Sequence, residues 1–342
     1  MLNKTLIVSL AVLLGACQSD AIESVTGERQ NEKPATEKTS EYQNQFVTLG
    51  TKGGPLLADD RSQPANALID GEHIYLVDVG DGAAGQFAKL GLPLKSVDAV
   101  FLSHLHFDHT AGLMGVLGLR YQTSAQKPIT IYGPPGTRET VDGLFAAMVP
   151  EMRVGYAVPG AKPPPSPQEK TIVVELVPDS TIDVNGMKVT TVENTHYTLP
   201  AGSEAAKVNK SYAYRFDLSD RSIVFTGDTG PSESVERLAQ GADLLVSEMM
   251  DVPFIIENMK RTYANNPKAP PPQVLEGVFK HLRDHHVTAE QVGEMASRSG
   301  VKQVVVTHFA AKEDAASLAR YEAEIAKNFD GDIAIAKDLQ RF

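Results

Sequence analysis

The sequence contains a single cysteine, Cys17, in 342 residues. One thiol cannot form a disulfide within the chain, so the fold depends on its hydrophobic core for stability. Cys17 is also the expected site of a lipid, as described below, which leaves no thiol for metal ligation or nucleophilic attack. We therefore exclude thiolate metal sites and cysteine-dependent catalysis.

Long hydrophobic runs are also missing. The apolar stretch Leu6–Leu14 has nine residues, whereas a helix needs roughly 20 to cross a bilayer. With Lys4 before it and Leu-Gly-Ala-Cys closing it at 14–17, the stretch is typical of a signal peptide over residues 1–16. The small residues before Cys17 resemble a bacterial lipoprotein signal, which implies a lipid on Cys17 and membrane attachment. The alternative is an ordinary secretory signal with a chance cysteine.

The segment after the leader has few apolar side chains. Residues 17–42 are rich in charge, so we expect a disordered tether. Gln18 and Ser19 follow Cys17, and no aspartate stands next to that cysteine. This pattern resembles lipoproteins that are sorted to the outer membrane. We therefore expect an exported bacterial lipoprotein, at the outer membrane and facing the periplasm. Residues 43–342 are expected to form one domain, and the sequence leaves the oligomeric state open, a homodimer included.

Positive charge is scarce as well. The chain has 32 lysine and arginine residues against 43 aspartate and glutamate residues, a formal net charge of −11. A negative surface repels polyanions, and no basic cluster offsets it. These observations argue against tRNA or DNA, and the expected partners include no nucleic acid.

Histidine, in contrast, is concentrated at one place. The apolar run 97–102 predicts a buried strand, and a helix is expected from residue 110. In the extended turn between them, alternate side chains point the same way, so His104 and His106 can converge on one ion. The following helical turn would aim Asp108 and His109 at a second point. Two adjacent ions are implied, roughly 3.5–4 Å apart.

His-x-His-x-Asp-His after an apolar strand resembles the metallo-β-lactamase superfamily. The resemblance implies an α+β fold, an αββα sandwich of two facing mixed sheets flanked by helices, with the metals at one edge. It also implies further ligands in a set order, which His196, Asp228 and His308 match, and a supporting role for Asp78. The implied metal ligands are His104, His106, Asp108, His109, His196, Asp228 and His308.

The resemblance implies that His104, His106 and His196 hold one metal, while Asp108, His109 and His308 hold the other. Asp228 and a hydroxide would bridge the two divalent ions, and the hydroxide would attack the substrate. Ligation by histidine and aspartate alone suits Zn²⁺ best and admits Mn²⁺ or iron.

Three residues are the predicted catalytic set: Asp108, His286 and Glu248. The run His286-Val-Thr-Ala resembles a motif that reaches the leaving group, so His286 is expected to protonate the leaving oxygen. Glu248 is expected to orient that imidazole. His281 and His285 are predicted to be surface or packing residues.

The substrate is less constrained. The opening Leu49–Pro55 resembles the arylsulfatase and tRNA 3′-processing branch, and Asp228 replaces the Cys or Ser of enzymes that open β-lactams. Residues 247–250, Ser-Glu-Met-Met, depart from the His-Glu-Ala-Thr of tRNA-processing enzymes, and their extended tRNA-holding arm is not found. We therefore predict a metal-dependent hydrolase of a small-molecule sulfate ester or phosphodiester. The alternatives are a lactonase or other carboxylic-ester hydrolase, a diiron redox protein, and a non-catalytic, metal-stabilised binding lipoprotein.

Two proline-rich stretches, 159–167 and 265–273, cannot hold a regular strand or helix. Each is either a plain loop or a loop that overhangs the metal edge and shapes substrate choice.

Overall fold

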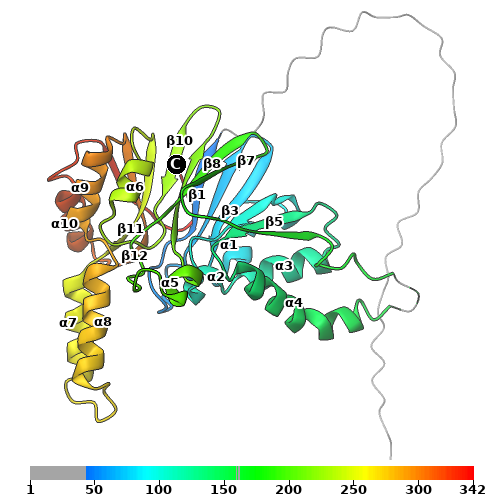
Figure 1. Ribbon diagram of the computed structural model, residues 1–342, viewed down its shortest axis with the longest axis horizontal. Helices are drawn as coiled ribbons and strands as arrows, with labels where there is room; N and C mark the ends of the chain where they lie inside the picture. Colours follow the sequence, from blue (N-terminus) through cyan, green and yellow to red (C-terminus); the bar gives the residue numbers. More distant parts are fainter. Residues whose placement is uncertain (1–43, 159, 161) are drawn as a thin grey trace, which may run out of the picture. The chain divides into compact units, whose positions relative to one another are not determined.

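The structure is a computed structural model that describes residues 44–158, 160 and 162–342. The predicted signal peptide (1–16), the predicted tether (17–42) and Cys17 lie outside the described residues. In the part that the structure describes, the strands form two seven-stranded sheets, and helices cover them (Figure 1).

The first sheet is built from β1 (Gln45–Gly50), β2 (Ala65–Asp70), β3 (His73–Val79), β4 (Ala99–Phe101), β5 (Ile129–Gly133), β6 (Thr171–Glu175) and β14 (Gln340–Arg341). Its order is β14-β1-β2-β3-β4-β5-β6. The strands from β14 to β3 pair antiparallel, and those from β3 to β6 run parallel. Beyond the β1–β14 pairs, the Phe46 N–H donates to the Phe342 carbonyl at 3.1 Å and the Phe342 N–H to the Phe46 carbonyl at 2.9 Å.

The second sheet is built from β7 (Ser180–Val184), β8 (Met187–Glu193), β9 (Tyr212–Asp217), β10 (Ser222–Phe225), β11 (Leu244–Met250), β12 (Gln303–Ala310) and β13 (Asp332–Ile335). Its order is β13-β12-β11-β10-β9-β8-β7, with the strands from β10 to β13 parallel. Every residue of β10 and β11 is buried. Strands that are covered on both faces have largely apolar sequences, as these two do.

Helices lie on the outer face of each sheet. The first sheet is covered by α1 (Ala83–Ala88), α3 (Leu113–Gln122) and α4 (Thr137–Val154), with the 3₁₀ turn η1 (Leu94–Ser96) beside them. The second sheet is covered by α6 (Glu233–Leu238), α9 (Ala289–Ser299) and α10 (Ala315–Ile325). Short helices α2 (Phe107–Thr110) and α5 (Glu204–Val208) lie in loops. The predicted αββα sandwich is confirmed.

The inner faces of the two sheets enclose an aromatic core. The ring of Phe101 on β4 lies 4.9 Å from that of Tyr132, 5.2 Å from Phe216 and 5.6 Å from Tyr214. Burying an aromatic side chain of this size contributes about 2–3 kcal/mol. Since Phe101 is followed by the histidine motif, this core fixes the base of the motif against the second sheet.

One strand ends earlier than the sequence predicts. The pattern of residues 187–196 predicts a strand that reaches His196, but β8 ends at Glu193. The reason lies in the side chain of Asn194, which donates to the Thr226 carbonyl at 2.8 Å and accepts from the His196 N–H at 3.1 Å. These bonds join the segments that follow β8 and β10 at the edge where the histidines lie.

Two further helices, α7 (Val252–Tyr263) and α8 (Pro272–Asp284), form a hairpin that projects from the sheets (Figure 1). Residues 264–271 join them at the far end, and Pro272 begins α8, where the missing N–H costs no helical bond. An α-helix of this length spans roughly 20 Å, so the proline-rich tip lies well away from the base of the hairpin. In the other stretch, Pro165 and Pro167 lie against Tyr121 near the end of α3. The alternative that these loops shape substrate choice stays a prediction.

Among the described residues, no helix is both long enough and apolar enough to cross a membrane.

Candidate metal centre

Asp78, at the end of β3, holds the loop that carries the histidine motif. Its Oδ1 accepts a hydrogen bond from the Ser103 N–H at 2.7 Å. Its Oδ2 accepts from the Ser103 hydroxyl at 2.7 Å and from His109 Nδ1 at 2.8 Å. Asp78 itself has φ 55°, in the left-handed region that non-glycine residues rarely occupy. The contacts agree with the supporting role expected for this residue.

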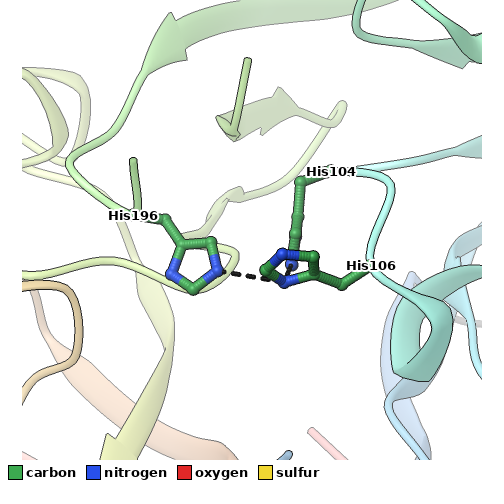
Figure 2. A group of neighbouring side chains, drawn as sticks. All are labelled: His104, His106 and His196. Carbon is green, nitrogen blue, oxygen red and sulfur yellow. Dashed lines mark hydrogen bonds between the residues drawn. The ribbon is translucent and has the colours of Figure 1, made fainter. Parts of the chain in front are cut away.

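The first group of predicted ligands comes from both sheets. His104 and His106 follow β4, and His196 follows β8; Figure 2 shows their three rings facing one another. His104 Nε2 and His196 Nε2 lie 3.0 and 3.2 Å from His106 Nδ1. His104 and His196 are almost completely buried, whereas His106 is open to solvent.

The second group combines Asp108, His109, Asp228 and His308, whose ligand atoms all lie within 4.8 Å of one another. Asp228 Oδ1 lies 3.3 Å from His109 Nε2, and Asp228 Oδ2 lies 3.2 Å from His308 Nε2. Asp228 Oδ2 is also 4.0 Å from the Nε2 atoms of His104 and His196. Asp228 therefore lies between the two groups. The structure brings all seven predicted ligands together, and their binding of metal stays a prediction.

The hydrogen bonds around these rings suit a cation. The Ser103 hydroxyl donates its proton to Asp78, so toward His104 it can act only as an acceptor. It therefore accepts a hydrogen bond from His104 Nδ1–H at 3.0 Å. His109 Nδ1–H donates to Asp78, and His196 Nδ1–H donates to the His285 carbonyl at 3.2 Å. In its neutral form each ring then presents a bare Nε2 to the centre, the arrangement by which outer partners orient metal-binding histidines.

Several buried atoms at the centre have no hydrogen-bond partner among the described residues. They are His109 Nε2, Asp228 Oδ1 and His308 Nδ1. An unpaired buried polar group costs about 1–3 kcal/mol, more if it is charged. Bare imidazole nitrogens and carboxylate oxygens converging in this way are the donor set of divalent ions such as zinc. The residues present therefore fit a pair of metal ions.

The charges at the centre demand a positive partner. Burial alone would lower the pKa of His109, but the carboxylates of Asp228 and Asp78 outweigh it and hold that pKa well above its usual range. Burial lowers the pKa of His104 far below its usual range, with the neighbouring His109 adding to the effect. Metals compete with protons for such nitrogens, so an ion can take the place of the proton that Asp228 would otherwise draw onto His109.

Glu248 on β11 and His286 after α8 form a buried pair beside this centre. His286 Nδ1 lies 3.0 and 2.9 Å from the two carboxylate oxygens, and the Thr229 N–H donates to Glu248 Oε1 at 2.6 Å. Burial lowers the pKa of His286, but Glu248 outweighs it and raises that pKa to about 9. The carboxylate therefore fixes the imidazole, and the expected catalytic roles of His286, Glu248 and Asp108 stay predictions.

The glycine-rich turn of residues 50–55 lies at this edge. The Gly54 N–H lies 3.2 Å from His308 Nε2. A Cβ at Gly53 would approach the His308 carbonyl to 2.6 Å, so only glycine allows this contact. The turn therefore supports the strand that carries the last predicted ligand.

Sequence reasoning missed some features of this edge. The ring of Tyr197 lies 4.9 Å from that of His196, and the ring of His281 lies 5.6 Å from it. Phe107, inside the motif, is 83% exposed. His281 and His285 are one helical turn apart, a spacing that predicts a shared face once α8 is recognised, but the helix itself was not predicted.

Residues 73–309 match the sequence profile of the beta-lactamase superfamily domain. Together with the two sheets and the histidine and aspartate centre, this match shows that the chain belongs to the metallo-β-lactamase superfamily. It is a metal-dependent hydrolase that acts on ester bonds, so the non-catalytic alternative is wrong.

Among relatives, the chain is 30% identical to ribonuclease Z of Mycobacterium marinum over 301 residues, covering 86% of this chain and 97% of that protein. It is 31% identical to ribonuclease Z of Mycobacterium sp. (strain KMS), covering 86% and 94%. The fold is similar to the metallo-beta-lactamase fold protein YhfI from Bacillus subtilis, with TM-score 0.62, 20% identity and coverage of 88% and 99%. It is also similar to the short form of human tRNase Z, with TM-score 0.59, 19% identity and coverage of 87% and 98%.

These relatives correct the substrate prediction. The prediction of a small-molecule sulfate ester or lactone as substrate was wrong, and so was the exclusion of nucleic acid. The relatives that match almost end to end are named as ribonucleases. The net charge gave a wrong expectation because it sums charges over the whole chain. At physiological salt, a charge on the surface acts over only about 8 Å, so local charge matters more for binding. The hairpin residues 252–285, for example, carry five lysine and arginine side chains and only three acidic ones.

Proposed function

We propose that this protein hydrolyses a phosphodiester bond in RNA. The observation that carries the proposal is the 30% identity to a ribonuclease Z over 97% of that protein's length, together with a centre suited to two metal ions. A match of this extent includes the strands and loops that surround the centre as well as the histidine motif.

His104, His106 and His196 would hold one ion, and Asp108, His109 and His308 the other, with Asp228 between them. When bound, such a pair of divalent ions lowers the pKa of a water molecule and stabilises negative charge on phosphate oxygens. We propose zinc, since histidine and aspartate ligands without thiolate suit it. Asp78 and the Ser103 hydroxyl keep the rings of His109 and His104 turned toward the ions.

His286 would supply the proton that the departing ribose oxygen needs. Glu248 occupies Nδ1 of this imidazole, so Nε2 is the nitrogen left to meet the substrate. The pair with Glu248 raises the pKa of this imidazole, which favours the protonated form that a proton donor needs. Proton donation of this kind contributes roughly 10²–10⁴-fold to a rate.

The test is cleavage of a labelled precursor tRNA with a 3′ extension by the purified protein, with Zn²⁺ or Mn²⁺ supplied. We expect one cut near the 3′ end, seen on a sequencing gel, and no cut by an Asp228→Ala variant. Bis(p-nitrophenyl) phosphate serves as a second substrate that reports phosphodiester hydrolysis alone. If the protein hydrolyses this small diester but leaves the RNA intact, the RNA part of the proposal is wrong.

A further inference from the structure

Two histidines of α8 and its end, His281 and His285, are not used by the chemistry above. His281 is half-buried, with its ring 5.6 Å from that of His196 and 5.5 Å from that of His286. One nitrogen of each of these three rings lies within 4.8 Å of the other two. His281 therefore forms part of the wall of the centre, on the side where His286 lies.

A hydrogen-bond chain fixes the orientation of His281. Its Nδ1 lies 2.7 Å from His285 Nδ1, and His285 Nε2 lies 2.5 Å from the hydroxyl of Thr198. The two histidines are four residues apart on the helix, so their rings meet on one face. A histidine that only filled space would not require such a chain, which begins on a different loop and ends at the centre.

The Nε2 atom of His281 is available for a hydrogen bond to a substrate. No hydrogen bond within the described residues uses its Nε2. His285 engages Nδ1 of His281 at 2.7 Å, which leaves Nε2 as the ring nitrogen available to a substrate. If Thr198 donates to His285 and His285 donates to His281, the ring proton of His281 lies on Nε2. This polarity gives the centre an N–H donor, which is what an anionic RNA requires.

We propose that His281 is a substrate-contacting residue that donates a hydrogen bond from Nε2 to an oxygen of the leaving nucleotide, and that His285 and Thr198 position it. The inference rests on the proposed cleavage of RNA and adds a specificity determinant to it. The leaving side is favoured because His281 lies beside His286, the proposed donor to the leaving oxygen. Because the contacted oxygen does not change its charge during the reaction, the contact is expected to act mainly on KM.

The test compares two substrates and three variants of the full chain. The substrates are the precursor tRNA and bis(p-nitrophenyl) phosphate, in which a nitrophenolate replaces the leaving nucleotide. His281→Leu removes the hydrogen bond at similar volume, His281→Gln keeps an amide N–H near the same place, and Thr198→Val removes the anchor of the chain. Val274→Ala, at an exposed position of the same helix, is the matched control.

For His281→Leu we expect kcat/KM on RNA to fall roughly 10–100-fold, mainly through KM, as for a lost hydrogen bond to a charged group. On bis(p-nitrophenyl) phosphate the change should stay below about 3-fold. His281→Gln should recover most of the loss, Thr198→Val should lose about 3–10-fold on RNA, and metal content should match the wild type throughout.

Equal losses on both substrates, or a Gln variant no better than Leu, would show that His281 only supports the structure and would overturn the inference. If the wild-type protein does not cleave RNA at all, the proposed function fails and this inference fails with it. The two outcomes can be distinguished, because the variants are compared only if the wild-type protein cleaves RNA. A failure of the His281 inference therefore leaves the proposed function intact.

Discussion

At the scale of single residues, Asp78 connects three parts of the candidate centre. Its carboxylate accepts from one backbone N–H, one hydroxyl and one imidazole, all of them buried. Removing it would leave three buried donors without a partner, at about 1–3 kcal/mol each. Asp78 also selects the tautomer of His109 and, through Ser103, that of His104.

We therefore predict that Asp78→Ala lowers both stability and metal affinity. The melting temperature should fall by several degrees, and the affinity for Zn²⁺ should fall about 10–100-fold, as for other losses of a partner that orients a ligand. Thermal unfolding and metal titration measure the two effects. Asp81→Ala, at an exposed position of the following turn, should change neither. An Asp78 variant with wild-type metal affinity would contradict the orienting role.

His286 allows a prediction that separates proton donation from metal binding. His286→Ala should slow hydrolysis of diesters with poor leaving groups, such as alkoxides, by roughly 10²–10⁴-fold. Nitrophenyl diesters, whose leaving group needs no proton, should lose far less. Metal analysis of the same samples is the control, and Glu248→Gln should produce a smaller loss with the same selectivity. Losses of equal size on both kinds of diester would rule out proton donation.

At the scale of helices and strands, the sequence was most informative where local pattern determines structure. The buried strand that leads into the histidine motif follows from the apolar run 97–102, and β4 confirms it. The end of β8 was not predicted, because it depends on the bond from the Asn194 side chain to the Thr226 carbonyl. Such bonds join segments more than 30 residues apart, and no local pattern encodes them.

The hairpin of α7 and α8 was missed for a different reason. The prolines of residues 265–273 predict an irregular loop, whereas the amphipathic helices on either side of them were not predicted. Missing this hairpin affected the prediction of the candidate site, because α8 positions His281. His281 was expected to be a surface or packing residue. The metal ligands could be named because their order matches a family, whereas the surrounding wall depends on the packing of α8, which no such motif encodes.

Asp251 anchors the start of this hairpin. Its carboxylate accepts from the Phe254 N–H at 3.1 Å, from Tyr321 at 2.7 Å and from Arg320 at 2.6 Å. Burial alone would raise the pKa of Asp251, but the bonds from Tyr321 and Arg320 outweigh it and lower that pKa. The anchor therefore stabilises the fold above the ordinary aspartate pKa of about 3.9, and this contribution is lost as pH falls below it.

We predict that Asp251→Asn costs about 2 kcal/mol of unfolding free energy at pH 7, from the lost cap and ion pair. The difference from the wild type should shrink as pH falls below about 4, because the wild-type carboxylate is then protonated. Urea unfolding at a series of pH values measures it. Glu257→Gln, on the exposed side of α7, is the control and should show no such trend.

At the scale of the whole molecule, the candidate centre lies where the two sheets meet. His104, His106, Asp108 and His109 follow a strand of the first sheet, while His196, Asp228 and His308 belong to the second. Bound ions would therefore connect the two halves of the sandwich. A ligand that binds only the folded state stabilises it by about 4 kcal/mol at a thousand times its Kd.

Chelation should accordingly lower the melting temperature. Dialysis against EDTA is expected to reduce it by roughly 5–10 °C, and returning Zn²⁺ should restore it. The Asp228→Ala variant should respond much less, because it lacks the carboxylate between the two ions. Differential scanning calorimetry gives the comparison directly, and a wild-type melting temperature indifferent to EDTA would speak against a metal that joins the sheets.

The predicted lipid on Cys17 has its own test, independent of the domain that the structure describes. We propose that the protein is exported as a lipoprotein, so a Cys17→Ala variant should move from the membrane fraction to the soluble fraction. Labelling of cells with radioactive palmitate should mark the wild type and not the variant. Ser19→Ala, close to the same position, is the control. A wild-type protein without label would refute the lipoprotein proposal.

The exchange of hydrogen bonds between Phe46 and Phe342 has a consequence for how the protein is made. A ribosome must deliver residue 342 before β1 receives its outer neighbour, so a nascent chain carries β1 as an open edge until that residue has been made. Open edges attract other strands. We therefore expect the newly made polypeptide to depend on a chaperone until β14 closes the first sheet.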